Sequence, residues 1–477
     1  MLGLRAKVMR GGAYLALRLG LGMIIGAGGV LLLTRAIGPG AYGVYGAALG
    51  VYMYLFQLSQ WGIKVYLIRR EEEAQSRDYH QAFSLLLILG LASAGLAVLV
   101  LPLLEGWVRI EGFGAVAAVM FAVLPVQLLG MVPMARLERE LDFRKVAAIE
   151  LSGQISYFLV ALPLAYRGMG SWAPVAGWWV QQSLIAALCF WATAYRPRLY
   201  WETERARAMV GYGLGYSSSI WVWQLRNLVI PLIVGRYGGA VAVGYVTLAI
   251  RMLEQLSFVK TAVWRLSIAA LARLQHDRAR LTKAVSEGMS LQTMALGPFL
   301  AAFGLAAPWL IPALFGPRWV PVLEIYPFIA LGYLVNAVFN LHSSALYVLR
   351  RNWAVTAFHL VHIFLFAGAA LVLVPRIGLT GYGWAEVAAL PGYLLLHLLF
   401  VRYAGRPDYA RAGVWLVAAG VPLFGWQLGP WAWVCAALPL LWPPTRRELW
   451  RVTVMVLGEA RSIGARGFRL SSRRLSP

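Results

Sequence analysis

The chain has 477 residues, of which 60% are hydrophobic and only 13% are charged, whereas an ordinary soluble domain carries about 25% charged residues. This composition excludes a disordered chain, a nucleic-acid-binding module and a water-soluble enzyme of ordinary build. The net charge of +23 arises from 43 basic and 20 acidic residues. Because the basic residues lie between long apolar runs, membrane topology explains their excess better than nucleic-acid binding does.

Long apolar runs follow one another along the chain. A transmembrane helix needs about 20 mostly apolar residues, because its backbone polar groups must pair within the helix. Twelve runs meet this requirement, at residues 13–34, 44–67, 82–103, 113–134, 147–166, 172–194, 210–235, 240–264, 288–315, 322–349, 354–375 and 380–403. The first follows a basic N-terminus without a small-residue cleavage site, so we expect a retained span. Residues 412–442, interrupted at 427–430, predict one span or a final hairpin of two.

The sequence therefore predicts an all-α polytopic membrane protein with about 14 transmembrane helices, and the positions of lysine and arginine predict its orientation. With the N-terminus inside, most of the 43 basic residues fall in inner segments, and six fall in outer loops. These six are Arg35, Arg109, Arg167, Arg236, Arg318 and Arg376. Basic residues accumulate on the cytoplasmic side, so both termini are expected there, the C-terminal one as the basic tail 443–477.

A faint internal repeat relates the two halves of the chain at an offset of 201 residues. At this offset Arg35 corresponds to Arg236, Gly38 to Gly239, Gly43 to Gly244, and Lys64 to Arg265. The repeat is six helices long and keeps its orientation, as do parallel repeats that place a substrate site between two halves. Chance together with ordinary turn chemistry is the alternative explanation.

An ordered series of segments resembles the Wzx-type oligosaccharide flippases, in particular their WzxC-like branch. Residues 31–70 resemble the opening of these proteins and read LLLTRAIGPGAYGVYGAALGVYMYLFQLSQWGIKVYLIRR. The match continues with ARLERELDFRKVAAIELSG (135–153), GMGSWAPVAGWWVQQ (168–182), GYVTLAIRMLEQL (244–256), AALARLQHDRARL (269–281) and WLIPALFGPRWVPVL (309–323). The resemblance covers residues 10–405, and its specificity lies in the order of the segments.

The superfamily of these flippases also contains lipid II flippases and multidrug antiporters. The resemblance implies two six-helix lobes that form a V around a central cavity, here residues 1–194 and 210–403, joined by a cytoplasmic linker at 195–209. It further implies alternating access and transport of a polyprenyl-pyrophosphate-linked oligosaccharide to the outer leaflet of the inner (cytoplasmic) membrane. Its expected partners are this substrate, membrane lipids, and a polysaccharide polymerase and glycosyltransferases; no nucleic acid is expected.

Charged residues inside the predicted spans are candidates for binding the pyrophosphate, because a charge in the membrane is costly unless it faces a cavity or a partner. Arg18, Lys64 and Lys260 lie close to the inner ends, where snorkelling to the headgroups is the alternative. Arg226 and Arg251 lie 9 and 11 residues from the outer ends of neighbouring helices, about 14 and 16 Å deep. We expect these two to form one anion site, and the alternative for Arg251 is a structural pair with Glu254.

Polar side chains cluster in several predicted spans and are expected to line the cavity. Packing between helices is the alternative role for each of them. The candidates are Tyr45, Tyr52, Tyr216, Ser218, Gln224, Asn227, Asn336 and Asn340. Glu254 is a candidate coupling carboxylate for a proton or sodium gradient.

Two other functional classes remain as alternatives. An ion-coupled exporter of small molecules would be expected to have an acidic cavity, but no predicted span of the first half has a carboxylate in its middle. A membrane polymerase or glycosyltransferase would need a large outer loop with catalytic carboxylates, and the predicted outer loops are short. The histidines have no metal-binding spacing and there is no phosphate-binding GxxxxGK[ST] motif, so no metal or cofactor is expected.

Overall fold

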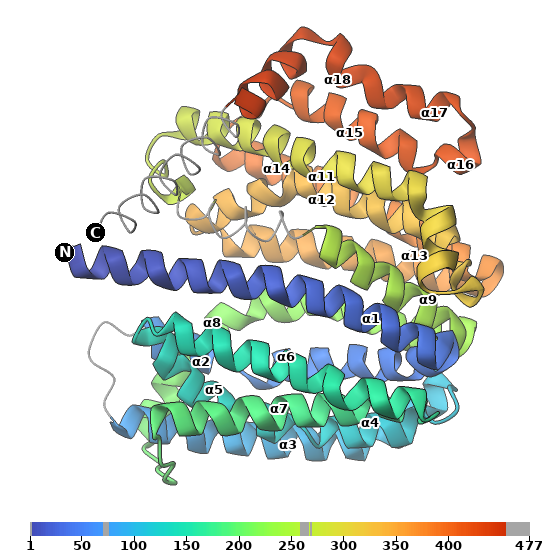
Figure 1. Ribbon diagram of the computed structural model, residues 1–477. Helices are drawn as coiled ribbons and strands as arrows, with labels where there is room; N and C mark the ends of the chain where they lie inside the picture. Colours follow the sequence, from blue (N-terminus) through green and yellow to red (C-terminus); the bar gives the residue numbers. More distant parts are fainter. Residues whose placement is uncertain (1, 70–75, 258–266, 268–269, 455–477) are drawn as a thin grey trace, which may run out of the picture. The chain divides into compact units, whose positions relative to one another are not determined.

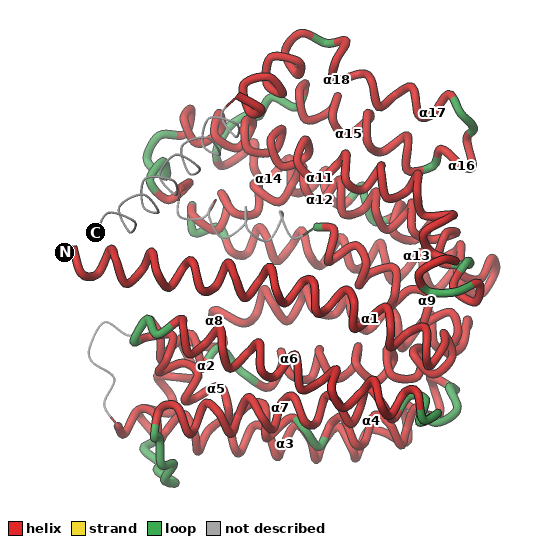
Figure 2. The backbone as a smooth tube through the Cα atoms, in the orientation of Figure 1, coloured by secondary structure: helices red, strands yellow, loops and turns green. Residues whose placement is uncertain are grey.

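The computed structural model describes residues 2–69, 76–257, 267 and 270–454, without the side chains of 2–13, 15–16, 215–216 and 219. Every regular element in these residues is helical (Figure 2). Nine helices in the described part are long and apolar enough to cross a membrane. The predicted all-α polytopic architecture is confirmed.

The helices follow the predicted spans closely (Figure 1). Their bounds are α1 Leu2–Ser59, α2 Ile63–Arg69, α3 Ser76–Val108, α4 Phe113–Phe121, α5 Leu124–Arg139, α6 Phe143–Tyr166, α7 Trp172–Thr193, α8 Thr203–Gln224, α9 Gly235–Leu256, α11 Arg278–Leu314, α12 Val322–Val348, α13 Asn352–Ala388, α14 Gly392–Tyr403, α15 Ala410–Leu423, α16 Gly425–Leu428, α17 Trp431–Val434 and α18 Leu438–Leu441. A 3₁₀ turn at Leu225–Leu228 and a π turn at Ile230–Val234 link α8 to α9.

Three of the nine helical stretches each cover two predicted spans. These stretches are Leu17–Ser59, Ile220–Leu256 and Asn352–Tyr403. Each contains a glycine with a positive φ, at Gly38, Gly239 and Gly378 respectively. The breaks at Gly38, Gly239 and Gly378 fall between the predicted spans, so the chain reverses where the hydropathy predicts an outer turn.

The backbone at the first two breaks supports the predicted repeat. Gly38 has φ 74° and ψ 175°, and Gly239 has φ 72° and ψ −175°. A side chain is strongly disfavoured at such angles, so glycine is needed at both positions. After the break, the helix restarts at Pro39 in one half and at its counterpart Ala240 in the other.

These two turns also pack against each other in a reciprocal manner. A β-carbon added at Gly43 would lie 1.7 Å from the carbonyl oxygen of Ala240, and one at Gly244 would lie 2.1 Å from that of Pro39. Adding 201 to 43 gives 244, and subtracting 201 from 240 gives 39. The repeat therefore converts the contact of Gly43 with Ala240 into the contact of Gly244 with Pro39. The backbones of the two turns are therefore in direct contact, which we call the outer junction.

Arg35 and Arg236, which correspond to each other in the repeat, connect the outer junction to the ends of two other helices. Arg35 Nη1 donates to the carbonyl oxygens of Ala313 and Leu314 at the end of α11, at 3.3 and 3.2 Å. Arg236 Nη1 donates to that of Trp107 at the end of α3, at 3.1 Å. The last carbonyls of a helix lack partners within it, and cationic donors stabilise them.

The chain divides into two compact units, each built from separate segments of the sequence. The first unit comprises residues 1–255, 307–332 and 350–399, and the second comprises 256–306, 333–349 and 400–477. The lobe boundaries at residues 194 and 210 stay a prediction. The predicted final hairpin region contains two short apolar helical stretches, Ala410–Leu423 and Trp431–Leu441.

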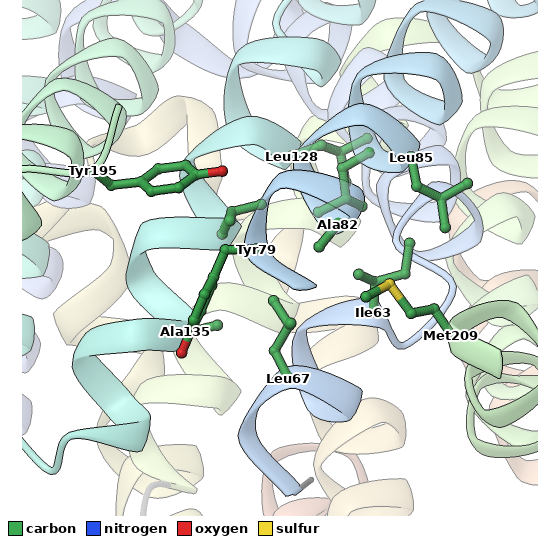
Figure 3. Packing of buried hydrophobic residues seen from close by; sticks show 11 residues of the cluster. Ile63, Leu67, Tyr79, Ala82, Leu85, Leu128, Ala135, Tyr195 and Met209 are labelled. Carbon is green, nitrogen blue, oxygen red and sulfur yellow. The ribbon is translucent and has the colours of Figure 1, made fainter. Parts of the chain in front are cut away.

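A hydrophobic cluster in the first unit fixes the short helix α2 (Figure 3). Ile63 and Leu67, one turn apart on α2, are fully buried against side chains of α3, α5 and α8, among them Leu128 and Met209. Burying the face of α2 that carries Ile63 leaves the neighbouring Lys64 on a different face. The core thereby sets the direction in which this cation points.

The orientation can be tested by labelling cysteines in a Cys435→Ser background, in which the remaining Cys189 is buried. Arg167→Cys and Arg376→Cys are expected to react with a membrane-impermeant thiol reagent added outside intact cells. Arg77→Cys, Arg198→Cys and Arg278→Cys are expected to react only after permeabilisation. All five side chains are exposed, so protection reports the side of the membrane and not burial; reaction of Arg198→Cys in intact cells would contradict the topology.

Candidate functional site

A cavity of about 700 Å³ lies within the first unit. Its walls come from both parts of α1, before and after Gly38, and from α2, α5, α6, α7 and α9. This volume lies in the range of small-molecule and cofactor sites, about 300–1,000 Å³. The cavity is thus large enough to enclose a polar headgroup, and it is lined almost entirely by residues of the first half of the chain.

Amide side chains dominate the polar part of the wall. They are Gln60, Gln127, Gln154, Gln181, Gln182 and Gln255. Gln154 Nε2 donates to the carbonyl oxygen of Gly22 at 2.7 Å, which fixes this amide against α1. Among the described residues, Gln181, Gln182 and Gln255 have no hydrogen-bond partner. An amide both donates and accepts hydrogen bonds, so these three are available to the hydroxyl groups of a ligand.

Aromatic rings form a second part of the wall. Tyr42, Tyr45, Tyr157 and Trp178 all line the cavity. Behind them, Tyr52 bonds to Gln127 and its ring meets Trp178 edge to face, with centroids 5.7 Å apart. Rigid aromatic faces beside a few directional polar groups are typical of sites that bind an organic ligand.

Among the described residues, three cations line the cavity, and each is paired with a carboxylate. Arg18 Nε lies 2.9 Å from Glu150 Oε2, Lys64 Nζ lies 2.7 Å from Glu138 Oε1, and Arg251 Nη1 lies 3.0 Å from Glu254 Oε2. The six side chains are between 23% and 48% exposed. The pair of Arg251 and Glu254 is the most exposed of the three, at 41% and 48%, so solvent weakens it most. An anion that enters the cavity would compete with the carboxylates for these cations.

The sequence predicts one anion site for Arg226 and Arg251, but Arg226 lies elsewhere. Arg226 is absent from the wall of this cavity, and its Nη2 contacts both carboxylate oxygens of Glu386 on α13. Glu386 is 2% exposed and also accepts a hydrogen bond from Tyr382 at 3.1 Å. The guanidinium further lies 4.9 Å from the ring centre of Phe366. A buried carboxylate is costly unless it has a partner. Glu386 is paired with Arg226, so the guanidinium of Arg226 does not line the cavity as expected.

The other predicted residues divide between this cavity and other places. Arg18, Lys64, Arg251 and Tyr45 line the cavity. Lys260 and the side chain of Tyr216 lie outside the described residues. Those with described side chains that lie elsewhere are Tyr52, Ser218, Gln224, Asn227, Glu254, Asn336 and Asn340. Gln224 and Asn227 bond to each other, Nδ2 to Oε1, at 3.2 Å, which corresponds to the packing alternative.

Sequence reasoning missed all six of these amides, as well as Tyr42, Tyr157 and Trp178. A signal was present, because glutamines recur within predicted spans of the first half, at positions 60, 127, 154, 181 and 182. A glutamine in a membrane span must find a polar partner or water. The recurrence of glutamine in several predicted spans therefore indicates that these spans share one polar cavity.

Comparisons with known proteins agree with this architecture. A profile of the family described as "Polysaccharide biosynthesis protein" matches residues 32–324. The succinoglycan biosynthesis transport protein ExoT of Rhizobium meliloti (strain 1021) is 25% identical over 309 residues, 64% of this chain and 61% of that protein. The lipopolysaccharide biosynthesis protein WzxC of Escherichia coli (strain K12) is 22% identical over 410 residues, 83% of this chain and 80% of that protein.

Solved structures show the same fold at low identity. The lipid II flippase MurJ in an inward closed conformation has a TM-score of 0.72 and 12% identity, covering 92% of this chain and 99% of that chain. An inward-facing multidrug resistance MATE family transporter has a TM-score of 0.62 and 15% identity, covering 81% and 98%. Likeness at this level concerns the fold and not the substrate.

Proposed function

Because the chain belongs to the polysaccharide biosynthesis protein family and is similar to the lipopolysaccharide biosynthesis protein WzxC, we propose that it is a lipid-linked saccharide flippase. Its substrate would be an oligosaccharide on polyprenyl pyrophosphate, carried by alternating access from the inner to the outer leaflet of the cytoplasmic membrane. The family membership confirms the resemblance predicted from the sequence. The relatives and structural neighbours named above are described as transporters, flippases or biosynthesis proteins.

The cavity in the first unit is the observation that carries this proposal. A saccharide exposes hydroxyl groups around a ring with apolar faces. The amides of Gln181, Gln182 and Gln255, which have no hydrogen-bond partner in the described part of the chain, match the hydroxyl groups because each amide can donate and accept. Tyr45 and Trp178 offer flat surfaces to the ring faces.

Arg18, Lys64 and Arg251 would receive the pyrophosphate, which the proposal places in the same cavity. Guanidinium groups bind phosphate oxygens through paired hydrogen bonds. The carboxylates of Glu150, Glu138 and Glu254 already balance these cations, so the bound anion would be held weakly enough to leave. An acidic cavity, as an exporter of cations would need, is not favoured, because the lining carboxylate Glu150 is paired with Arg18.

Energy coupling, the position of the termini and partner enzymes belong to the same proposal. Glu254 remains the candidate carboxylate for a proton or sodium gradient, and it is half-exposed beside Arg251. Both termini are proposed to be cytoplasmic. A polymerase and glycosyltransferases would act on either side of the transport step.

The function can be tested with Gln181→Leu,Gln255→Leu in cells that lack the native gene. We expect surface glycan to fall at least about tenfold, the effect of losing hydrogen bonds worth ~1 kcal/mol each at two sites. The lipid-linked precursor should accumulate in the inner leaflet. Surface glycan is measured by lectin binding, and the precursor by mass spectrometry of extracted lipids.

The matched control is Gln427→Leu, the same chemical change at an exposed position in the final hairpin region. It should display glycan as the wild type does, at an equal protein level in the membrane fraction. Full display by the double variant would exclude the cavity as the saccharide site. Normal display in cells without any copy of the gene would exclude the flippase function itself.

A further inference from the structure

The helix at residues 443–454, in the second unit, is held in a fixed rotation by one of its faces. Glu448, which is 6% exposed, accepts hydrogen bonds from Ser290 Oγ at 2.7 Å and Trp415 Nε1 at 3.4 Å. Its carboxylate also pairs with Arg411 at 3.4 Å. Thr445, fully buried, donates to the carbonyl oxygen of Pro439 at 2.7 Å. These bonds join the helix to α11, α15 and α18.

The opposite face is basic and aromatic. Arg446, Arg447, Trp450, Arg451 and Val454 are all exposed, and they follow the spacing of one helix face. The single acidic residue of this helix, Glu448, is turned inward, so no carboxylate of the helix offsets the three guanidinium groups. We call these five residues the basic face.

The surroundings of the basic face identify the kind of partner that it fits. The helix directly follows α18, whose Leu440 and Leu441 are 53% and 73% exposed, as lipid-facing residues are, and Trp450 is 72% exposed. Tryptophan concentrates where a membrane meets water, and arginine binds phosphate oxygens in pairs. Arg411, which pairs with Glu448 of this helix, lies at the end of the segment 404–411. The predicted orientation places this segment on the inner side.

We propose that the basic face binds anionic phospholipid headgroups of the inner leaflet. The arginines contact headgroup phosphates while Trp450 and Val454 lie at the boundary of the acyl chains, as in helices that rest on a membrane surface. Because Glu448 fixes the rotation, the three arginines are held toward the lipid before it binds. This site is separate from the saccharide cavity and does not rest on the proposed transport function.

The test uses the purified full chain in detergent, incubated with equal amounts of phosphatidylglycerol and phosphatidylcholine. Bound lipid is counted by native mass spectrometry. We expect the wild type to retain phosphatidylglycerol preferentially, and Arg446→Gln,Arg447→Gln,Arg451→Gln to lower this preference at least about fivefold. The control Arg196→Gln,Arg198→Gln,Arg207→Gln makes the same charge change at exposed positions of the first unit and should behave as the wild type.

A second measurement on the wild type keeps the proposal testable if the triple variant does not fold. A photoactivatable phosphatidylglycerol should label a peptide that contains residues 446–454, and inorganic phosphate should not compete. Unchanged preference in the triple variant, equal loss in the control, or labelling confined to other peptides would overturn the proposal. So would displacement of the lipid by soluble RNA or polyglutamate, because the face would then bind polyanions in general.

Discussion

Gly43→Val is expected to prevent the chain from folding in the membrane, and Gly43→Ala to lower the free energy of unfolding by at least about 3 kcal/mol, the upper range for an overpacked interior. The reason is the position of the carbonyl oxygen of Ala240, only 1.7 Å from where a β-carbon would stand. The obstacle is backbone, so no side-chain rotation can relieve it. The two turns of the outer junction would have to separate.

The nearby Gly40 provides the control for this experiment. A β-carbon at Gly40 would meet Val241 Cγ2 at 3.8 Å, an ordinary van der Waals contact, so Gly40→Ala should be close to neutral. Thermal unfolding of the detergent-solubilised protein, followed by tryptophan fluorescence, measures the difference. Gly244→Ala should resemble Gly43→Ala, because its contact with Pro39 is the repeat-related equivalent. Equal melting temperatures for Gly43→Ala and Gly40→Ala would show that the junction does not constrain the fold.

The spans and the turns between them could be predicted because the cause of each lies within a short stretch of sequence. A membrane span is determined by about 20 consecutive side chains, and the turns between spans by glycines such as Gly38 and Gly239. The 201-residue repeat was visible for the same reason. The reciprocal contact of Gly43 with Ala240 and of Gly244 with Pro39 required the folded chain.

The cavity could be predicted only in part. Their position inside predicted spans made Arg18, Lys64 and Arg251 candidates for a cavity, with snorkelling as the alternative for Arg18 and Lys64. In the structure all three line the cavity and pair with a carboxylate. Depth could not distinguish Arg251 from Arg226, because the difference is the presence of Glu386, 160 residues along the chain. A pattern read one helix at a time contains no information about which helix becomes its neighbour.

The pair of Arg226, which is 22% exposed, and the buried Glu386 leads to the last expected result, a double-mutant cycle on stability and transport. Glu386→Gln leaves the guanidinium without its counter-charge, and Arg226→Met leaves a carboxylate that is 2% exposed. Each single change is expected to cost about 3–5 kcal/mol, the usual effect of breaking a buried ion pair. The loss of stability in each single variant comes mainly from the charge that is left without a partner, and not from the lost attraction between the two side chains.

Arg226→Met,Glu386→Met should therefore be more stable than either single variant, since apolar side chains of similar size can replace a buried pair with little loss. Recovery will be incomplete, because the hydrogen bond from Tyr382 is lost at a cost of about 1 kcal/mol. Stability is measured by thermal unfolding, and transport by surface glycan at equal membrane levels. A double variant as unstable as the singles would contradict the pairing. If it folds and displays glycan, Arg226 has a structural role only; if it folds without display, Arg226 takes part in transport despite lying outside the cavity wall.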